Sequence, residues 1–174
     1  MKKQGFTIIE VVLVLAIAGL IFLMVFLALP TLQRNQRDTQ RRNELGRVAS
    51  QVQQFMGNNQ GRIPANDGWN AFAAAYMRVG SDFFIDPNGQ PFMFTVSSVQ
   101  NQPTTLLRTM PCPANTVVDG QAFTDCVPIY VFHGAECHGE GVRSVAAGAR
   151  RVAFRISLEG AGTYCVDNGA GGGA

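Results

Sequence analysis

Histidine, cysteine and glutamate side chains, the types that bind zinc, gather in one short stretch of the sequence. They are His133, Glu136, Cys137, His138 and Glu140, with Cys126 or Cys165 as a further candidate ligand. Four such ligands would close a structural zinc site. Their spacing fits no standard zinc pattern, however, and a cysteine in an oxidising compartment is more often half of a disulfide. We therefore expect no metal site and no cofactor.

The four cysteines are better explained as disulfide partners. Cys112, Cys126, Cys137 and Cys165 are an even number in a small domain, and Pro, Gly or turn-like sequence flanks three of them. This pattern indicates a disulfide framework. We favour Cys112 with Cys126, which closes a proline-flanked loop, and Cys137 with Cys165, which ties the loop after one predicted strand to the final strand. Four cysteines allow three pairings, and the sequence leaves the other two open.

The remaining sequence offers no pattern for catalysis, so we do not expect an enzyme. It contains no nucleophile elbow, no phosphate-binding glycine loop and no paired carboxylates in a credible context. Residues 62–174 hold seven basic and nine acidic residues, a net charge of −2, and their only local basic cluster is Arg150, Arg151 and Arg155. Nucleic-acid binding is therefore not expected either.

One carboxylate stands at an unusual position. Glu10 begins the apolar run Val11–Leu29, nineteen residues without a charge. As a helix this run is roughly 28 Å long, close to the roughly 30 Å hydrocarbon core of a bilayer. A charge inside a bilayer costs on the order of 3 kcal/mol, so Glu10 is expected to have a function. The alternative is that Glu10 only marks the edge of the span, near the headgroups.

The apolar run predicts a single membrane-spanning helix. A cleaved secretory signal is the weaker alternative, because the run ends in Leu29 and Pro30 without a small-residue cleavage site. The flanking charges alone would place the C-terminal side in the cytoplasm, because basic residues are more numerous on that side. Only Lys2 and Lys3 precede the run, whereas the arginines of residues 34–47 follow it. The cysteines favour the opposite orientation, with the C-terminal domain outside.

The elements that follow predict an α+β fold. Apolar residues recur at steps of three and four from Leu45 to Met56, so the helix should continue to a terminator cluster at residues 57–61 and pack one face on a sheet. The arginines of residues 34–47 are expected to form a solvated basic surface, with contact to anionic lipid or to a neighbour's acidic head as the alternative. A shorter helix is predicted from Asp67, its N-cap, to Val79.

Alternating apolar and polar residues predict an antiparallel sheet. The expected strands are Phe92–Val96, Val127–His133, Val152–Leu158 and Thr163–Val166. The third strand should have one apolar and one polar face, and residues 160–162 should join it to the fourth as a hairpin. The glycine-rich residues 169–174 are expected to be a flexible tail.

The beginning of the chain resembles the class III signal of type IV pilins and pseudopilins. The shared features are a short basic leader ending in Gly5, then Phe6, a polar Thr7, two aliphatic residues, Glu10 and an uninterrupted apolar run. In that family a membrane peptidase cuts after the glycine and methylates the new amino-terminal phenylalanine. The resemblance implies cleavage between Gly5 and Phe6 and N-methylation of Phe6. Loss of Lys2 and Lys3 would leave twelve basic and twelve acidic side chains.

The resemblance also implies roles for residues within the helix. In the family, the glutamate corresponding to Glu10 neutralises the amino terminus of a neighbouring subunit during filament assembly. Helix-breaking residues similar to Gly19 and Pro30 mark where the helix bends in the free subunit and melts or stretches in the fibre. A turn similar to residues 86–92 occurs in major pseudopilins and some pilins, although Asn88 replaces a common tryptophan.

The fold implied is a pilin fold, in which the second half of a long helix packs on an antiparallel sheet of a disulfide-linked head. Its expected parts are a leader (1–5), a transmembrane and filament-core helix (6–30), an amphipathic second half (31–61), a head (62–168) and the tail (169–174). The precursor would cross the cytoplasmic membrane once with its head outside, and the mature form would lie in an extracellular pilus.

The function implied is that of a pilin, a subunit of a type IV pilus supporting motility, adhesion or uptake. Its partners would be other pilin subunits, the prepilin peptidase, the assembly platform and, before assembly, membrane lipid. One alternative is a pseudopilin of a type II secretion-like or DNA-uptake machine. Another is a membrane-anchored binding or enzymatic domain whose leader is never cut.

Overall fold

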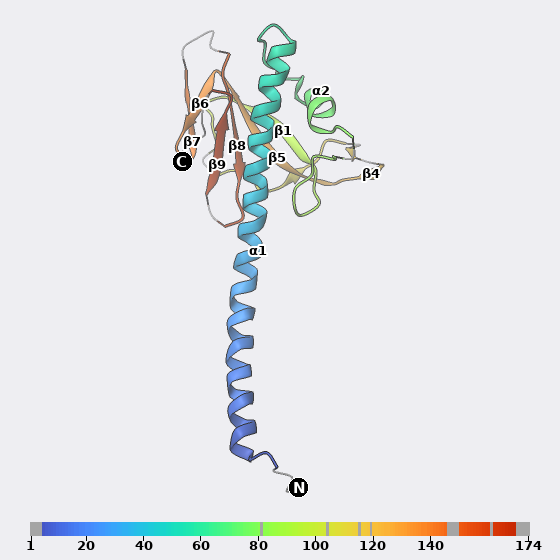
Figure 1. Cartoon of the computed structure of the whole chain (residues 1–174). Helices are drawn as coiled ribbons and strands as arrows, with labels where there is room; N and C mark the ends of the chain where they lie inside the picture. The colour runs from blue at the N-terminus through green and yellow to red at the C-terminus, as the bar shows by residue number, and fades with distance from the viewer. Residues whose placement is uncertain are drawn as a thin grey trace.

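A long helix projects from a head of mixed α and β structure, with its amino-terminal end farthest from the head (Figure 1). The computed structural model describes residues 5–80, 82–103, 105–114, 116–118, 120–145, 150–160 and 162–169. Most of the predicted leader, residues 1–4, and all but the first residue of the predicted tail lie outside the described residues.

The helix, α1 (Ile8–Asn58), is continuous through Gly19 and Pro30. It ends inside the predicted terminator cluster, where Gly61 donates a backbone hydrogen bond to the carbonyl of Met56 at 2.7 Å. Gly61 has a φ of +73°, a conformation that glycine adopts without steric cost. The expected melting of α1 at Gly19 and Pro30 in a fibre stays a prediction.

The second helix is shorter than predicted and changes form along its length. α2 spans Trp69–Phe72 and continues as a π-helix, η1 (Ala73–Met77). The N-cap is Gly68, so the predicted cap at Asp67 is wrong, and the helix ends before Val79. Because Trp69, Phe72 and Met77 are almost completely buried, core packing sets the form of this segment.

The main sheet has the strand order β1-β5-β8-β9. The strands are β1 (Phe92–Ser97), β5 (Asp125–His133), β8 (Val152–Ser157) and β9 (Thr163–Asp167), and the short β2 (Met110–Pro111) pairs with the beginning of β5. β5, β8 and β9 are antiparallel, whereas β1 and β5 are parallel, with Phe92 opposite Val127. The sheet is therefore mixed but mostly antiparallel, and the predicted antiparallel sheet is confirmed except for the parallel pairing of β1 with β5. The long connection over residues 98–124 provides the crossover that a parallel pair requires.

Two small hairpins extend the head. β3 (Val117–Val118) pairs with β4 (Gln121–Ala122), and β6 (Ala135–His138) pairs with β7 (Gly141–Ser144). Disulfides join Cys112 to Cys126 and Cys137 to Cys165, the two pairs favoured from the sequence, with Cα–Cα distances of 5.1 and 5.8 Å. The second disulfide ties the β6-β7 hairpin to β9.

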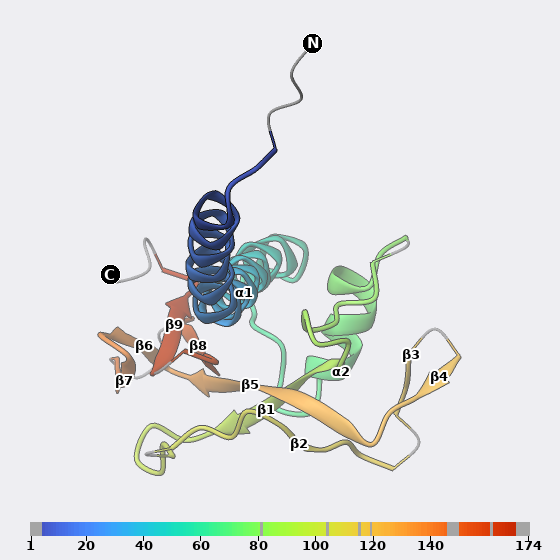
Figure 2. The same cartoon turned by 90° about the horizontal axis from the view of Figure 1, so that it is seen from below.

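Both faces of the main sheet are covered. On one face, α1 and α2 pack over the strands and bury a core around Trp69, Leu45 and Phe154 (Figure 2). On the other face, a smaller cluster includes Leu106, Phe132 and the β6-β7 hairpin. Every residue of β8 is consequently buried, including those expected on its polar face.

Candidate assembly helix and its junction with the head

The first half of α1 is apolar and uncovered. It contains a stretch long and apolar enough to cross a membrane, and none of that stretch is buried within the protein. Large side chains stay exposed from Phe6, at 85%, to Leu32, at 57%. Soluble proteins rarely expose contiguous apolar patches of more than a few hundred Å². The surface of this half must therefore be covered by something outside the chain.

Phe6 and Glu10 lie together at the beginning of this exposed half. Thr7 is the N-cap of α1, although its side chain makes no capping hydrogen bond, and Glu10 is in the first turn, where a carboxylate interacts favourably with the helix dipole. Phe6 and Glu10 border one shallow depression together with Val11 and Val14. Glu10 is exposed, and among the described residues ion pairs occur only from Arg37 onward.

The second half of α1 presents the opposite arrangement, because two of its charged side chains, Asp38 and Arg41, are buried against the head. Arg41, only 3% exposed, donates two hydrogen bonds to Asp86, from Nε at 2.5 Å and from Nη2 at 2.9 Å. The Asp86 side chain is completely buried. Burial acts to lower the pKa of Arg41, but the hydrogen bond and charge of Asp86 outweigh it and raise that pKa. Two-point pairing of this kind holds a guanidinium in a fixed orientation.

Glu159, just after β8, connects two arginines of the helix. Its carboxylate accepts hydrogen bonds from Arg37 at 2.7 and 2.8 Å and from the Asn88 amide at 2.7 Å, and it lies 3.1 Å from Nη2 of Arg41. The pKa of Glu159 falls from 4.5 to about 2, chiefly because Arg37 donates to the carboxylate; burial opposes this change, and Asn88 and the charge of Arg41 add to it.

Asp38 fixes the β8-β9 turn to the helix. Its two carboxylate oxygens accept hydrogen bonds from the backbone N–H groups of Glu159 at 2.7 Å and Gly160 at 2.9 Å. A Cβ at position 160 would lie only 3.1 Å from Oδ2 of Asp38. This close approach of backbone to carboxylate favours glycine. We call the five residues Arg37, Asp38, Arg41, Asp86 and Glu159 the junction network.

The turn predicted at residues 86–92 supplies the buried carboxylate of the junction network. Asp86 and Gln90 pair through their backbones at 2.7 Å, and Gly89 donates to the carbonyl of Asp86 at 2.7 Å with a φ of +84°. The Asp86 carboxylate also accepts from the N–H of Asn88 at 3.1 Å. The turn therefore orients Asp86 toward Arg41.

The prediction of a solvated basic surface over residues 34–47 is wrong for three of its arginines. Arg37 and Arg41 belong to the junction network, and Arg47 pairs with Glu44 and Asp82 and lies over the Phe84 ring. The acidic partner of Arg41 lies 45 residues away in the sequence, so local charge pattern could not identify it. One signal was present: Arg41 continues the apolar stripe of Leu45, Val48 and Val52 by one helical turn.

The residues considered for zinc are used in other ways. Cys137 is in a disulfide, and Glu136 pairs with Arg143 and Arg151. Nε2 of His133 accepts a hydrogen bond from Trp69 at 3.2 Å, and burial lowers the pKa of this histidine. In the part of the chain that the structure describes, no three His, Cys, Asp or Glu side chains lie close enough to hold a metal ion.

Two of the three arginines considered as a basic cluster are engaged within the head. Arg151 is paired with Glu136 at 3.2 Å and with Asp167 at 3.9 Å. Arg155 is 6% exposed and lies within the sheet. Neither presents a free positive charge on the surface.

Comparison with known proteins supports the interpretation of the amino terminus. Residues 1–26 match the family model described as the prokaryotic N-terminal methylation motif. The chain carries the class III signal typical of type IV pilins and pseudopilins. Its long helix, packed on a mixed and mostly antiparallel sheet in a head with two disulfides, forms a pilin-like α+β fold. No curated protein and no solved structure matches the chain significantly. The class III signal implies processing by a prepilin peptidase, and proteins of this pilin-like type are generally structural.

Proposed function

We propose that this pilin-like chain is the structural subunit of a type IV pilus, which supports motility, adhesion or uptake at the cell surface. The observation that carries the proposal is the uncovered apolar half of α1 on a helix whose other half is packed into a head. The precursor is held in the cytoplasmic membrane by this half, with the head outside. After cleavage, the same surface packs against identical helices in a fibre.

The apolar surface of the exposed half is energetically suited to both proposed environments, first the membrane and then the fibre. Apolar surface removed from water contributes about 25 cal/mol per Å², so the side chains of this half are stable in lipid or against other helices but not in water. Lipid competes for the same surface, so helix packing in the fibre is driven by close contact rather than by the full hydrophobic effect. During assembly the apolar surface of the exposed half therefore moves from contact with lipid to contact with other helices.

Glu10 sets the register of that packing in our proposal. A carboxylate or an ammonium group buried alone in an apolar core is costly, whereas the two together compensate each other. The methylated amino group of Phe6 on one subunit pairs with Glu10 of its neighbour. The exposure of Glu10 and its position in the first turn of α1 support this pairing.

The junction network suits a subunit that bears tension along α1. Ion pairs and backbone hydrogen bonds attach the head at Arg37, Asp38 and Arg41, just beyond the uncovered half. Gly19 and Pro30 lie before this attachment, where only helical hydrogen bonds and outside contacts hold the chain. Stretching in a fibre would therefore begin at these residues while the head stays folded.

A pseudopilin of a type II secretion-like or DNA-uptake machine is the second candidate. The turn at residues 86–92 favours it, because this turn is similar to one found in major pseudopilins and its Asp86 forms the buried pair with Arg41. Both candidates use the same processed amino terminus. They differ in whether the fibre reaches the cell surface.

Mass spectrometry of the amino-terminal peptide from protein sheared off the producing cells separates the candidates. A peptide beginning at methylated Phe6 in the sheared fraction supports the pilus. Processed protein that stays entirely with the cells supports the pseudopilin. A chain that still begins at Met1 or Lys2 contradicts both, and a Gly5→Val variant, in which cleavage should be blocked, provides the reference for the intact start.

A further inference from the structure

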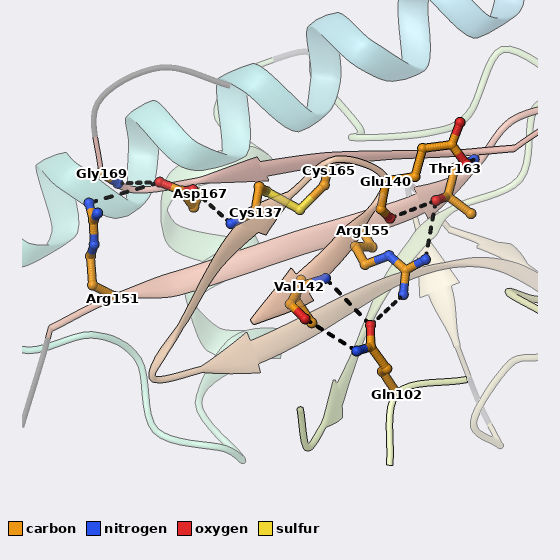
Figure 3. Close-up of a disulfide and its surroundings, with 10 residues drawn as sticks. All are labelled: Gln102, Cys137, Glu140, Val142, Arg151, Arg155, Thr163, Cys165, Asp167 and Gly169. Carbon is orange, nitrogen blue, oxygen red and sulfur yellow. Dashed lines mark hydrogen bonds and ion pairs between the residues drawn. A yellow bond between two sulfur atoms is a disulfide. The ribbon is translucent and has the colours of Figure 1, made fainter. Parts of the chain in front are cut away.

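The face of the sheet turned away from α1 contains an arginine that forms no ion pair with any residue the structure describes. Arg155, in the middle of β8, is 6% exposed and is covered by the loop after β1 and by the β6-β7 hairpin (Figure 3). Its Nη1 donates to the Gln102 amide oxygen at 3.2 Å, and its Nη2 donates to the Thr163 hydroxyl at 3.2 Å. Both acceptors are neutral.

These two acceptors hold the guanidinium in place. The Gln102 side chain is itself paired with the backbone of Val142, accepting from its N–H at 3.4 Å and donating to its carbonyl at 3.2 Å. The Thr163 hydroxyl donates to the backbone carbonyl of Glu140 at 2.9 Å, which leaves its lone pairs for Arg155. Arg155 is thus oriented by groups that are fixed to β7 and β9 (Figure 3).

The charge of Arg155 is not compensated within the described part of the chain. None of the ion pairs found there includes Arg155, and its Nε has no hydrogen-bond partner. Burial lowers the pKa of Arg155, and the charge of the exposed Glu140, a smaller effect, acts in the opposite direction. Arg41 is buried to a similar degree but is paired with Asp86. A guanidinium has five N–H donors, and three of those on Arg155 remain for another group.

A cavity of about 320 Å³ lies beside this guanidinium. Its polar lining consists of Arg155, Arg108, Thr105, Ser157, Thr163 and Glu140. Arg108 is held at the rim by a hydrogen bond of 3.0 Å to the carbonyl of Glu159. The lining therefore carries two positive charges and one negative charge, together with the hydroxyl groups of Thr105 and Ser157, each of which can donate a hydrogen bond.

We propose that the cavity between Arg155 and Arg108 is a binding site for a carboxylate group. Guanidinium groups recognise carboxylates through paired hydrogen bonds, and such a ligand would compensate the buried charge of Arg155. The single excess positive charge suits a group with one negative charge, and Glu140 at the rim would repel a doubly charged phosphate. The carboxylate belongs either to a small organic acid or to a side chain of a neighbouring subunit. The site itself does not depend on the proposed function; only the second source of the carboxylate, a neighbouring subunit, rests on the proposed fibre.

Binding of sodium acetate to the full chain in non-ionic detergent tests this site. Saturation-transfer NMR on the acetate methyl group, at constant ionic strength, should show saturable binding. Arg108→Gln, at the exposed rim, should weaken binding on the order of tenfold, because it removes charge-assisted hydrogen bonds. Arg155→Gln should abolish binding. Arg62→Gln, which removes an exposed arginine elsewhere in the head, should leave binding unchanged.

The controls keep the result interpretable if a variant is unstable. Fluorescence of the single tryptophan, Trp69, reports whether the core is intact, and the Arg108 variant does not disturb a buried residue. Absence of saturable acetate binding to the folded wild type, or equal binding by the folded Arg108 and Arg62 variants, would overturn the proposal. Tighter binding of lactate, a larger organic acid with the same single charge, than of acetate identifies a free organic acid as the ligand. Acetate binding that is lost in sheared fibres identifies a neighbour's carboxylate.

Discussion

The two halves of α1 contrast in composition and in surroundings. The first half is almost purely apolar, yet its side chains are exposed. The second half is rich in charge, yet Asp38 and Arg41 are buried at 8% and 3% exposure. In water, one would expect apolar residues to be covered and charged residues to be solvated.

The difference shows that the two halves are completed by different partners. The second half is completed within the chain, because Asp86 and Glu159 supply the opposite charges and the sheet supplies the apolar contacts. The first half finds no partner within the described chain, and in our proposal lipid or other subunits complete it. On this proposal one continuous helix carries an intramolecular interface and an intermolecular one, and substitutions in the two halves should affect different measurements.

The largest expected effect is on assembly, in the first half. Glu10→Ala should leave a folded, membrane-held protein but reduce sheared filament more than a hundredfold, because an unpaired buried charge costs about 3 to 5 kcal/mol. Filament yield is measured in the sheared fraction, and thermal unfolding of the detergent-solubilised protein serves as control. A normal filament yield would refute the pairing role of Glu10.

The largest expected effect on folding is in the junction network. Asp86→Ala leaves Arg41 buried without its main partner, so the free energy of unfolding should fall by about 3 to 5 kcal/mol. Asp67→Ala, which removes an exposed carboxylate outside the network, should change it by less than about 0.5 kcal/mol. Both are measured by denaturant unfolding in detergent. Equal effects of the two substitutions would contradict the stabilising role of the network.

A matched pair of leucines sharpens the comparison. Leu45, in the second half, is 0% exposed, and Leu20, in the first half, is 60% exposed. Leu45→Ala should destabilise the head by about 2 to 5 kcal/mol, because it removes a core side chain and leaves a cavity. Leu20→Ala should leave head unfolding unchanged within about 0.5 kcal/mol. If Leu20→Ala destabilised the head as much, the first half would not be an independent surface.

The smallest expected effect is the acid sensitivity of the junction. The pKa of Glu159 is lowered from 4.5 to about 2 in the folded protein. Its contribution to stability is therefore fully present above pH 4.5 and is lost as the pH falls toward 2. Glu159→Gln should lower the free energy of unfolding at neutral pH. It should also make that free energy depend less on pH in the acid range, as followed by Trp69 fluorescence. If the free energy of unfolding depended on acid pH equally in the wild type and the variant, Glu159 would not be the group whose protonation destabilises the junction.

Much of the fold could be predicted because it depends on local patterns. The strand residues alternate with a period of two, and the helix residues repeat at three and four, so the main elements were expected close to their observed positions. The parallel pairing of β1 with β5 was missed, since pairing direction depends on the path of residues 98–124 rather than on the strands themselves. The π-helical form of Ala73–Met77 was missed because core packing decides it.

The candidate site likewise has features that could be predicted from consecutive residues and others that depend on the fold. The class III signal could be predicted because its features lie in consecutive residues, whereas cleavage after Gly5, methylation of Phe6 and the assembly role of Glu10 stay predictions. The partners of Arg37 and Arg41 could not, because Asp86 and Glu159 are brought to the helix only by the folding of distant segments.

The sequence by itself determined the class III signal, the apolar run and the main helix and strands, since each depends on neighbouring residues and their periodicity. Only the tertiary structure decided which charges are buried and how they are compensated. Burial depends on the fold of the whole chain: it places Arg41 against Asp86 and leaves Arg155 without an ion pair among the described residues, although both arginines stand close to other arginines in the sequence.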